Sequence, residues 1–135
     1  MKIILSTLVL AMAIIFSGCA KSADPTPDAG ARAAFLGKWS VTETWTKLTY
    51  EVNITADPVS STGVFIYNFA GTGAASLPAG AEVTGTTILL DPDQIIGTNI
   101  KINGSGGLVG TKITWNYTLD DGANLIHAVA TYTKL

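Results

Sequence analysis

Alternating apolar and polar residues constrain the fold of this chain more than any other feature. From Leu48 to Ala56 every second residue is apolar, and the residues between them are polar. The segment from Ile113 to Leu119 repeats this pattern. Successive side chains of a strand point to opposite faces of a sheet, so this period of two predicts antiparallel strands with one buried and one solvated face.

The first predicted strand begins at Gly37 and carries Trp39 and Val41 on its apolar face, with Glu43 as the exception. The apolar residues change parity between Trp45 and Leu48. Because one strand keeps its parity, this change predicts a turn near residues 46–47.

Turn residues separate the later predicted strands. Asp91-Pro92-Asp93 predicts a turn, and Gly97 predicts a bulge. The glycine-rich residues 103–107 fit either a turn or a weakened continuation of the preceding strand. The further strands are expected at residues 64–69, 82–84, 86–90, 95–102, 111–119 and 125–132. About eight short strands with no helical pattern between them predict an all-β antiparallel meander, closed into a small barrel that hides its edges.

The amino terminus has a different pattern. Lys2 precedes an apolar run from Ile3 to Phe16 that is interrupted by two hydroxyl residues. This run is shorter than the roughly 20 apolar residues that span a bilayer as a helix. A basic start, a short apolar segment and small residues at its end are typical of a secretory signal.

The segment Phe16-Ser17-Gly18-Cys19 resembles the cleavage site of bacterial lipoproteins, in which a bulky apolar residue and two small residues precede a cysteine. Cys19 is the only cysteine of the chain. The resemblance implies attachment of diacylglycerol to the Cys19 sulfur, cleavage before Cys19 and acylation of the new amino terminus. The alternatives are a plain signal peptide and a membrane anchor that is never cleaved.

We therefore expect a lipoprotein signal peptide at residues 1–18, a lipidated amino terminus with a flexible tether at residues 19–34, and a barrel domain at residues 35–135. The alanine-rich residues 29–34 could instead form a short helix that closes one end of the barrel. Ala20 follows the cysteine and is not acidic. By the lipoprotein resemblance, this favours the outer membrane of a bacterial cell envelope.

The segment Phe35-Leu36-Gly37-Lys38-Trp39 resembles the start of a lipocalin barrel, where a G-x-W motif opens the first strand and its tryptophan plugs one end. Residues 35–135 as a whole resemble small lipocalin-like lipoproteins of Gram-negative bacteria, which share the ending seen here in residues 130–134. The resemblance implies a barrel that holds a small hydrophobic ligand. A basic residue of the last strand that packs on the tryptophan, another lipocalin feature, is not evident in the sequence.

Several classes of function find no support. The net charge of −2 provides no basic surface for nucleic acid. His127 is the only histidine, and it has the parity opposite to the apolar residues of its strand, which predicts that it faces solvent. With Cys19 lipidated, no metal site of several His or Cys ligands can form. Two pairs of aspartates lie in predicted turns, Asp91 with Asp93 and Asp120 with Asp121. Each pair supplies too few oxygen ligands to bind calcium. We expect neither an enzyme nor a cofactor.

Aromatic side chains are the remaining candidates for a site. Six of them lie on the apolar parity of their strands, namely Trp39, Trp45, Tyr50, Trp115, Tyr117 and Tyr132. They could line a cavity for a small hydrophobic ligand, or they could fill the core, because an eight-stranded barrel is just wide enough to be filled by side chains. In the second case the protein would meet an envelope protein through an exposed apolar face such as residues 64–67, or through a sheet edge.

Overall fold

The computed structural model describes residues 29–135, and the signal segment 1–18, Cys19 and the predicted tether up to residue 28 lie outside the described residues. The described residues begin with a helix, α1 (Ala29–Phe35), and include a short 3-10 helix, η1 (Phe69–Gly71). The strands are β1 (Gly37–Glu43), β2 (Thr49–Ala56), β3 (Gly63–Tyr67), β4 (Ala79–Thr84), β5 (Thr87–Leu90), β6 (Gln94–Ile96), β7 (Ile100–Val109), β8 (Lys112–Asp120) and β9 (Leu125–Lys134).

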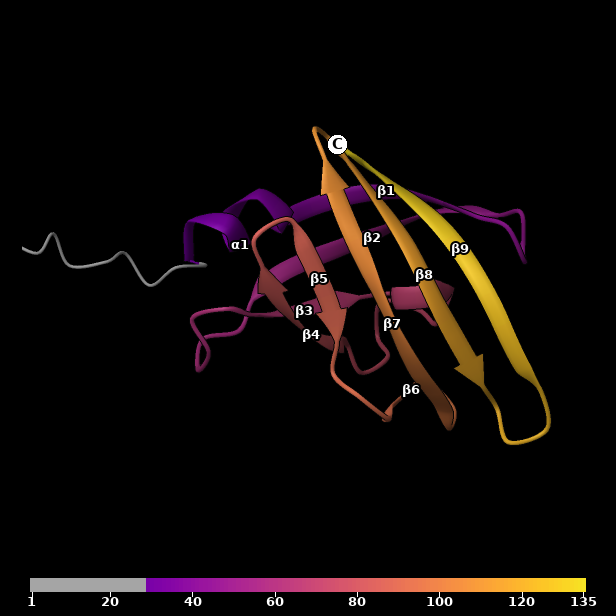
Figure 1. The fold of residues 1–135 in the computed structure, drawn as a ribbon. Coiled ribbons are helices and arrows are strands. Elements are labelled where there is room, and N and C mark those ends of the chain that lie inside the picture. Colours follow the sequence, from indigo (N-terminus) through magenta and orange to yellow (C-terminus); the bar gives the residue numbers. More distant parts are fainter. Residues whose placement is uncertain (1–28) are drawn as a thin grey trace, which may run out of the picture.

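The strands form one antiparallel sheet that closes on itself (Figure 1). Its order is β5-β4-β3-β2-β1-β9-β8-β7-β6, and pairing of β5 with β7 completes the ring. β6 pairs with the other half of β7, so β5 and β6 together occupy one of eight strand positions. The predicted all-β meander and closed barrel are therefore confirmed.

A two-residue register shift separates β5 from β6. Along β7, Leu89 of β5 faces Ser105, whereas Gln94 of β6 faces Ile102. Side chains bridge the interruption, since Asp93 N donates to Asn103 Oδ1 over 2.9 Å. Gln94 Oε1 accepts from Gly80 N and its Nε2 donates to Gly80 O, both at 2.7 Å. The residues between Leu90 and Gln94 form the predicted turn, and this turn interrupts one strand position as a bulge.

One predicted strand differs in the structure, and two other expectations are met. The strand predicted at residues 95–102 is a tight hairpin, because Gly97 and Asn99 adopt positive φ and reverse the chain between β6 and β7. The glycine-rich residues 103–107 continue β7, as the second alternative required. Gly106 is needed there, because a Cβ atom would lie 2.9 Å from both Ile113 Cγ2 and Trp115 Cδ2. The predicted reversal near residues 46–47 is present, with Lys47 at positive φ.

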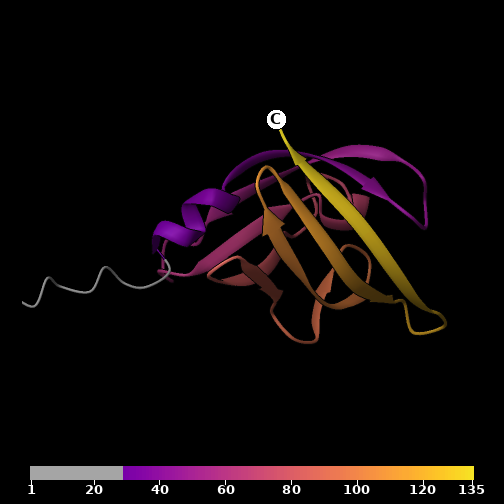
Figure 2. The same ribbon diagram turned by 45° about the horizontal axis from the view of Figure 1, so that its top comes forward.

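Helix α1 closes one end of the barrel, which realises the second alternative for residues 29–34. The Arg32 guanidinium donates to the backbone oxygen of Ser60 over 2.6 Å and so holds the loop between β2 and β3. Trp39 Nε1 donates to Phe35 O over 2.8 Å, and both side chains are fully buried. Figures 1 and 2 show α1 at one end and the β1–β2 and β8–β9 loops at the other.

Lys134 of the last strand completes this closed end. Its Nζ lies 4.5 Å from the ring centroid of Trp39, within the range of a cation–π contact. The same Nζ donates to the backbone oxygens of Leu36 and Ala34, which terminate α1. A basic residue of the last strand therefore does pack on the tryptophan, and the sequence reading that found none is wrong. The hydrogen bond between Lys134 and Leu36 joins positions 98 residues apart, which no local pattern reveals.

The interior of the barrel is filled by inward-facing side chains of every strand. The largest fully buried ones include Trp39, Trp115 and Tyr132, together with isoleucines from β2, β3, β5, β7 and β8. Phe69 of η1 inserts between strands and meets the rings of Trp115 and Tyr117 edge-on, with centroids 5.5 and 5.0 Å apart. Each such aromatic pair contributes about 0.5–1.5 kcal/mol beyond its buried area.

Candidate functional site

The six aromatic residues singled out in the sequence do not line one cavity. Trp39 lies at the end that α1 closes, whereas Trp115, Tyr117 and Tyr132 are buried deeper in the barrel and Tyr50 is half-buried. Trp45 follows the end of β1 and is 43 % exposed. One of the six aromatics therefore seals the closed end, one lies on the surface of the open end, and the other four lie between them.

A buried carboxylate accepts hydrogen bonds from two of the interior aromatics, Tyr50 and Tyr117. Glu43 is the one charged side chain among the buried residues of the described chain, with 3 % of its surface exposed. Its Oε1 accepts hydrogen bonds from the hydroxyls of Tyr50 and Tyr117, and its Oε2 accepts one from Thr46 Oγ1 over 3.1 Å. The sequence marked Glu43 only as an exception to the apolar parity of β1. This exception could have predicted a buried carboxylate, because Glu43 shares the parity of the inward-facing residues of β1.

The tyrosine hydroxyls around Glu43 stay protonated at neutral pH. Burial raises the pKa of Tyr50 and of Tyr117 well above the usual tyrosine value, and the Glu43 carboxylate adds to both shifts. Burial also raises the pKa of Tyr132, with a further contribution from the nearby Tyr117 and Glu43. Tyr50 and Tyr117 therefore act as hydrogen-bond donors, not as bases, and together they hold one carboxylate in an apolar interior.

Two polar atoms near this cluster have no hydrogen-bond partner among the described residues. They are Tyr132 Oη and Trp115 Nε1, and both residues are fully buried. Their rings pack against each other with centroids 5.7 Å apart. A buried polar group without a hydrogen bond destabilises the fold by about 1–3 kcal/mol. The interior around Glu43 therefore has fewer of its polar groups hydrogen-bonded than the end closed by α1.

A groove opens on the surface above this cluster. It has a volume of about 290 Å³ and is bordered by the β1–β2 loop, η1 and the adjoining ends of β7, β8 and β9. Its walls are mostly apolar, and Asp121 stands at the rim; the other lining residues are Trp45, Ala70, Gly71, Thr72, Ile100, Leu119 and Ile126. Among the aromatics singled out in the sequence, Trp45 is the one that lines this groove.

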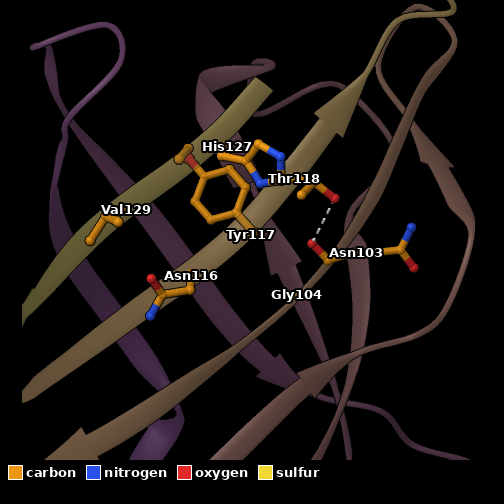
Figure 3. Close-up of a pocket in the computed structure, with 8 residues that line it drawn as sticks. Asn103, Gly104, Asn116, Tyr117, Thr118, His127 and Val129 are labelled. Carbon is orange, nitrogen blue, oxygen red and sulfur yellow. Dashed lines mark hydrogen bonds between the residues drawn. The ribbon is translucent and has the colours of Figure 1, made fainter. Parts of the chain in front are cut away.

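A second hollow, of about 360 Å³, lies on the outer face of β7, β8 and β9 (Figure 3). His127 and Thr118 are cross-strand neighbours there, and His127 is exposed as its parity predicts. The polar groups around His127 form hydrogen bonds with neighbouring strands and turns. Thr118 Oγ1 donates to Asn103 O over 3.4 Å, and Asn103 Nδ2 donates to Asp93. The hollow is a depression of the sheet surface, and the Thr118 hydroxyl beside His127 donates to the backbone of Asn103.

The acidic pairs of the sequence serve turns. Asp120 Oδ1 accepts from Gly122 N over 2.8 Å, and Asp121 Oδ1 accepts from Ala123 N and Asn124 N over 2.9 and 2.7 Å. In the described part of the chain, no three His, Cys, Asp or Glu side chains lie close enough to hold a metal ion. Among residues 29–135, no helix has the length and apolar content needed to cross a bilayer.

No model of a known protein family matches this chain, and no curated protein matches it either. The lipoprotein and lipocalin resemblances of the sequence therefore stay predictions, and the structure supports the coarser statement that the chain forms a small closed antiparallel β-barrel.

Proposed function

We propose that this protein is a lipid-anchored protein of the bacterial cell envelope whose barrel binds a small hydrophobic ligand at its open end. The observation that carries the ligand part is the groove of about 290 Å³, with apolar walls and an exposed tryptophan beside it. Sites of this kind combine apolar walls with a few polar groups that orient the ligand. Inward-facing side chains fill the interior of the barrel, so we place the ligand at its mouth.

The anchor part of the proposal rests on the sequence before the described residues. Lipid chains on Cys19 would hold the protein durably, because each buried methylene contributes about 0.8 kcal/mol and two or three chains add up. The groove lies at the end of the barrel away from α1, so an attachment before α1 would leave the groove accessible (Figure 1). Ala20 favours the outer membrane as the site of attachment.

The anchor is tested by the intact mass of the membrane-extracted protein beside a Cys19→Ala variant. A mass of residues 19–135 plus acyl chains, absent from the variant, supports lipidation. A cleaved chain without acyl groups, or an uncleaved chain, contradicts it.

The groove is tested with benzyl alcohol, a neutral apolar probe, added to the mature protein in detergent micelles. Binding is measured from the methyl NMR resonances of Leu119 and Ile126, which line the groove. Ile126→Phe should fill the groove and abolish saturable shifts at Leu119. Val129→Phe places the same bulk on the same strand but on its exposed outer face, and should leave binding intact. Absence of saturable shifts in the unsubstituted protein would reject the groove as a ligand site.

A second candidate is a structural or protein-interaction role without a ligand. The filled interior favours it, because the core needs no ligand to be complete. Val64 and Ile66 of the apolar β3 segment are buried, which leaves Phe65 and Tyr67 for an outer contact. A Phe65→Ser/Tyr67→Ser variant tests this protein-interaction role. The role is favoured if the variant no longer binds an envelope protein that the unsubstituted protein binds, and if benzyl alcohol does not bind in the groove.

A further inference from the structure

The carboxylate of Glu43 is buried without a positive charge among its hydrogen-bond partners. Its three donors are the neutral hydroxyls of Tyr50, Tyr117 and Thr46. Burying a carboxylate is costly unless it is paired with a cation and fully hydrogen-bonded. Hydroxyl donors supply hydrogen bonds but do not balance its charge, so the site is electrostatically incomplete.

The two oxygens of Glu43 are held differently. Oε1 is fixed by two tyrosines that extend from strands β2 and β8 of the barrel. Oε2 is held by Thr46, which belongs to the short loop between β1 and β2. Trp45 of the same loop is 43 % exposed, and Leu48 is 64 % exposed. Oε2 is therefore the oxygen that a small movement of this loop would release.

Trp45 and Tyr117 connect the groove to Glu43. Trp45 lines the groove, and the next residue in the chain, Thr46, donates to Glu43 Oε2. The Tyr117 hydroxyl donates to Glu43 Oε1. Leu119, on the opposite wall, follows Tyr117 on the inward face of β8. The hydroxyl of Tyr132, whose pKa the nearby Glu43 helps to raise, has no hydrogen-bond partner among the described residues. The β1–β2 loop and β8 thus join the groove to the buried polar cluster, and Glu43 itself lies behind the groove wall.

We propose that the groove recognises a small molecule with an apolar body and a protonated amine, and that the amine pairs with Glu43 Oε2 beneath Trp45. The proposal rests on the function proposed above and specifies its ligand class. The ammonium group takes over the hydrogen bond of Thr46 to Oε2 and supplies the missing positive charge. The rings of Trp45 and Tyr117 favour the same cation through their π faces. The one charged residue at the groove rim, Asp121, is also acidic, so the site repels anions.

The test compares benzylamine, which is cationic at pH 7, with benzyl alcohol of nearly the same shape, in the mature protein. Dissociation constants come from the methyl resonances of Leu119 and Ile126. We expect benzylamine to bind about tenfold more tightly, a difference of about 1.4 kcal/mol. The Glu43→Gln variant should lose this preference. The Glu51→Gln control removes the same charge from the exposed face of β2 and should keep it.

The outcomes separate this proposal from the one it rests on. Equal affinity for the amine and the alcohol overturns the amine inference and leaves the groove as a ligand site. Binding of neither probe rejects the groove itself. A preference that disappears in Asp121→Asn but survives in Glu43→Gln assigns the charge recognition to the rim and overturns the role of Glu43.

A second measurement keeps the test decisive if the Glu43→Gln variant fails to fold. In the unsubstituted protein, the carboxyl ¹³C resonance of Glu43 should shift when benzylamine is added and should stay in place with benzyl alcohol. A Glu43 resonance that responds to neither probe, while the groove methyls do respond to benzylamine, overturns the proposal.

Discussion

The two ends of the barrel differ in how their polar groups are satisfied. At the closed end, Trp39, Lys134 and Arg32 each donate to backbone oxygens and hold α1 and a neighbouring loop in place. At the open end, Glu43 lies buried among neutral hydroxyls and Tyr132 Oη has no partner among the described residues. The end whose polar side chains are hydrogen-bonded stabilises the fold. The end whose polar side chains lack partners can still form hydrogen bonds with a ligand. The comparison therefore predicts that substitutions at the closed end cost stability and those at the open end change ligand binding.

Removing the two tryptophans at opposite ends should give the largest contrast. Trp39→Ala should destabilise the protein by about 3–5 kcal/mol, because it leaves a large cavity. It also removes the donor to Phe35 O and the ring beneath Lys134. Trp45→Ala should cost less than about 1 kcal/mol, since exposed positions contribute little. Urea unfolding followed by circular dichroism measures both, and similar losses for the two variants would break the comparison.

Substituting Tyr117 and Tyr132, which are both buried, should change stability by different amounts, and this difference should be smaller than that between the two tryptophan variants. Tyr117→Phe removes a donor to the buried Glu43 carboxylate and should cost about 1–3 kcal/mol. Tyr132→Phe removes a hydroxyl without a partner and should leave stability unchanged or raise it slightly. The free energies of unfolding in urea decide this. A large loss in Tyr132→Phe would show that its hydroxyl is satisfied in solution, and the open end would then resemble the closed one.

Local sequence patterns predicted the strands of both ends but not the contacts that make the ends different. Alternation placed Trp39, Tyr117 and Glu43 on inward faces, and the barrel followed from the spacing of the strands. The hairpin between β6 and β7 was missed, because one glycine inside an apolar run fits a bulge as well as a reversal. Asn99, which also takes positive φ in that hairpin, was the further signal.

The partners of the buried polar groups were beyond prediction for a physical reason. Glu43 meets a tyrosine 74 residues away, and Lys134 meets Leu36 across 98 residues. These contacts exist only because the sheet closes and brings β1 between β2 and β9. The position of a residue in the alternating pattern predicts that its side chain lies in the interior. It predicts neither how far along the barrel axis the side chain lies nor which residue it contacts. The sequence could therefore predict which types of residue form the site, but not how they are arranged.

Lys134 should make the closed end respond to alkaline pH. Burial lowers the pKa of Lys134, so the folded protein binds this proton less tightly than the unfolded chain does. Stability should therefore rise as the pH increases from the lowered pKa toward the ordinary lysine value of about 10.4. A Lys134→Met variant should lack this rise. Thermal unfolding between neutral and alkaline pH checks it, with Lys112→Met, an exposed position on β8, as the control.

Asp121 should make the open end respond to acid, with the smallest effect of the series. Hydrogen bonds from the backbone of Asn124 and Ala123 lower the pKa of Asp121. A lowered carboxyl pKa stabilises the fold above the ordinary aspartate value of about 3.9, and this contribution disappears as the pH falls through the lowered pKa. The difference in melting temperature between the unsubstituted protein and Asp121→Asn should thus shrink on acidification. Because Asp121 is fully exposed, the shift should also weaken in high salt. A difference that is constant from neutral to acidic pH would mean that the β8–β9 loop is held by its backbone geometry alone, and the rim of the groove would then carry no charge dependence of its own.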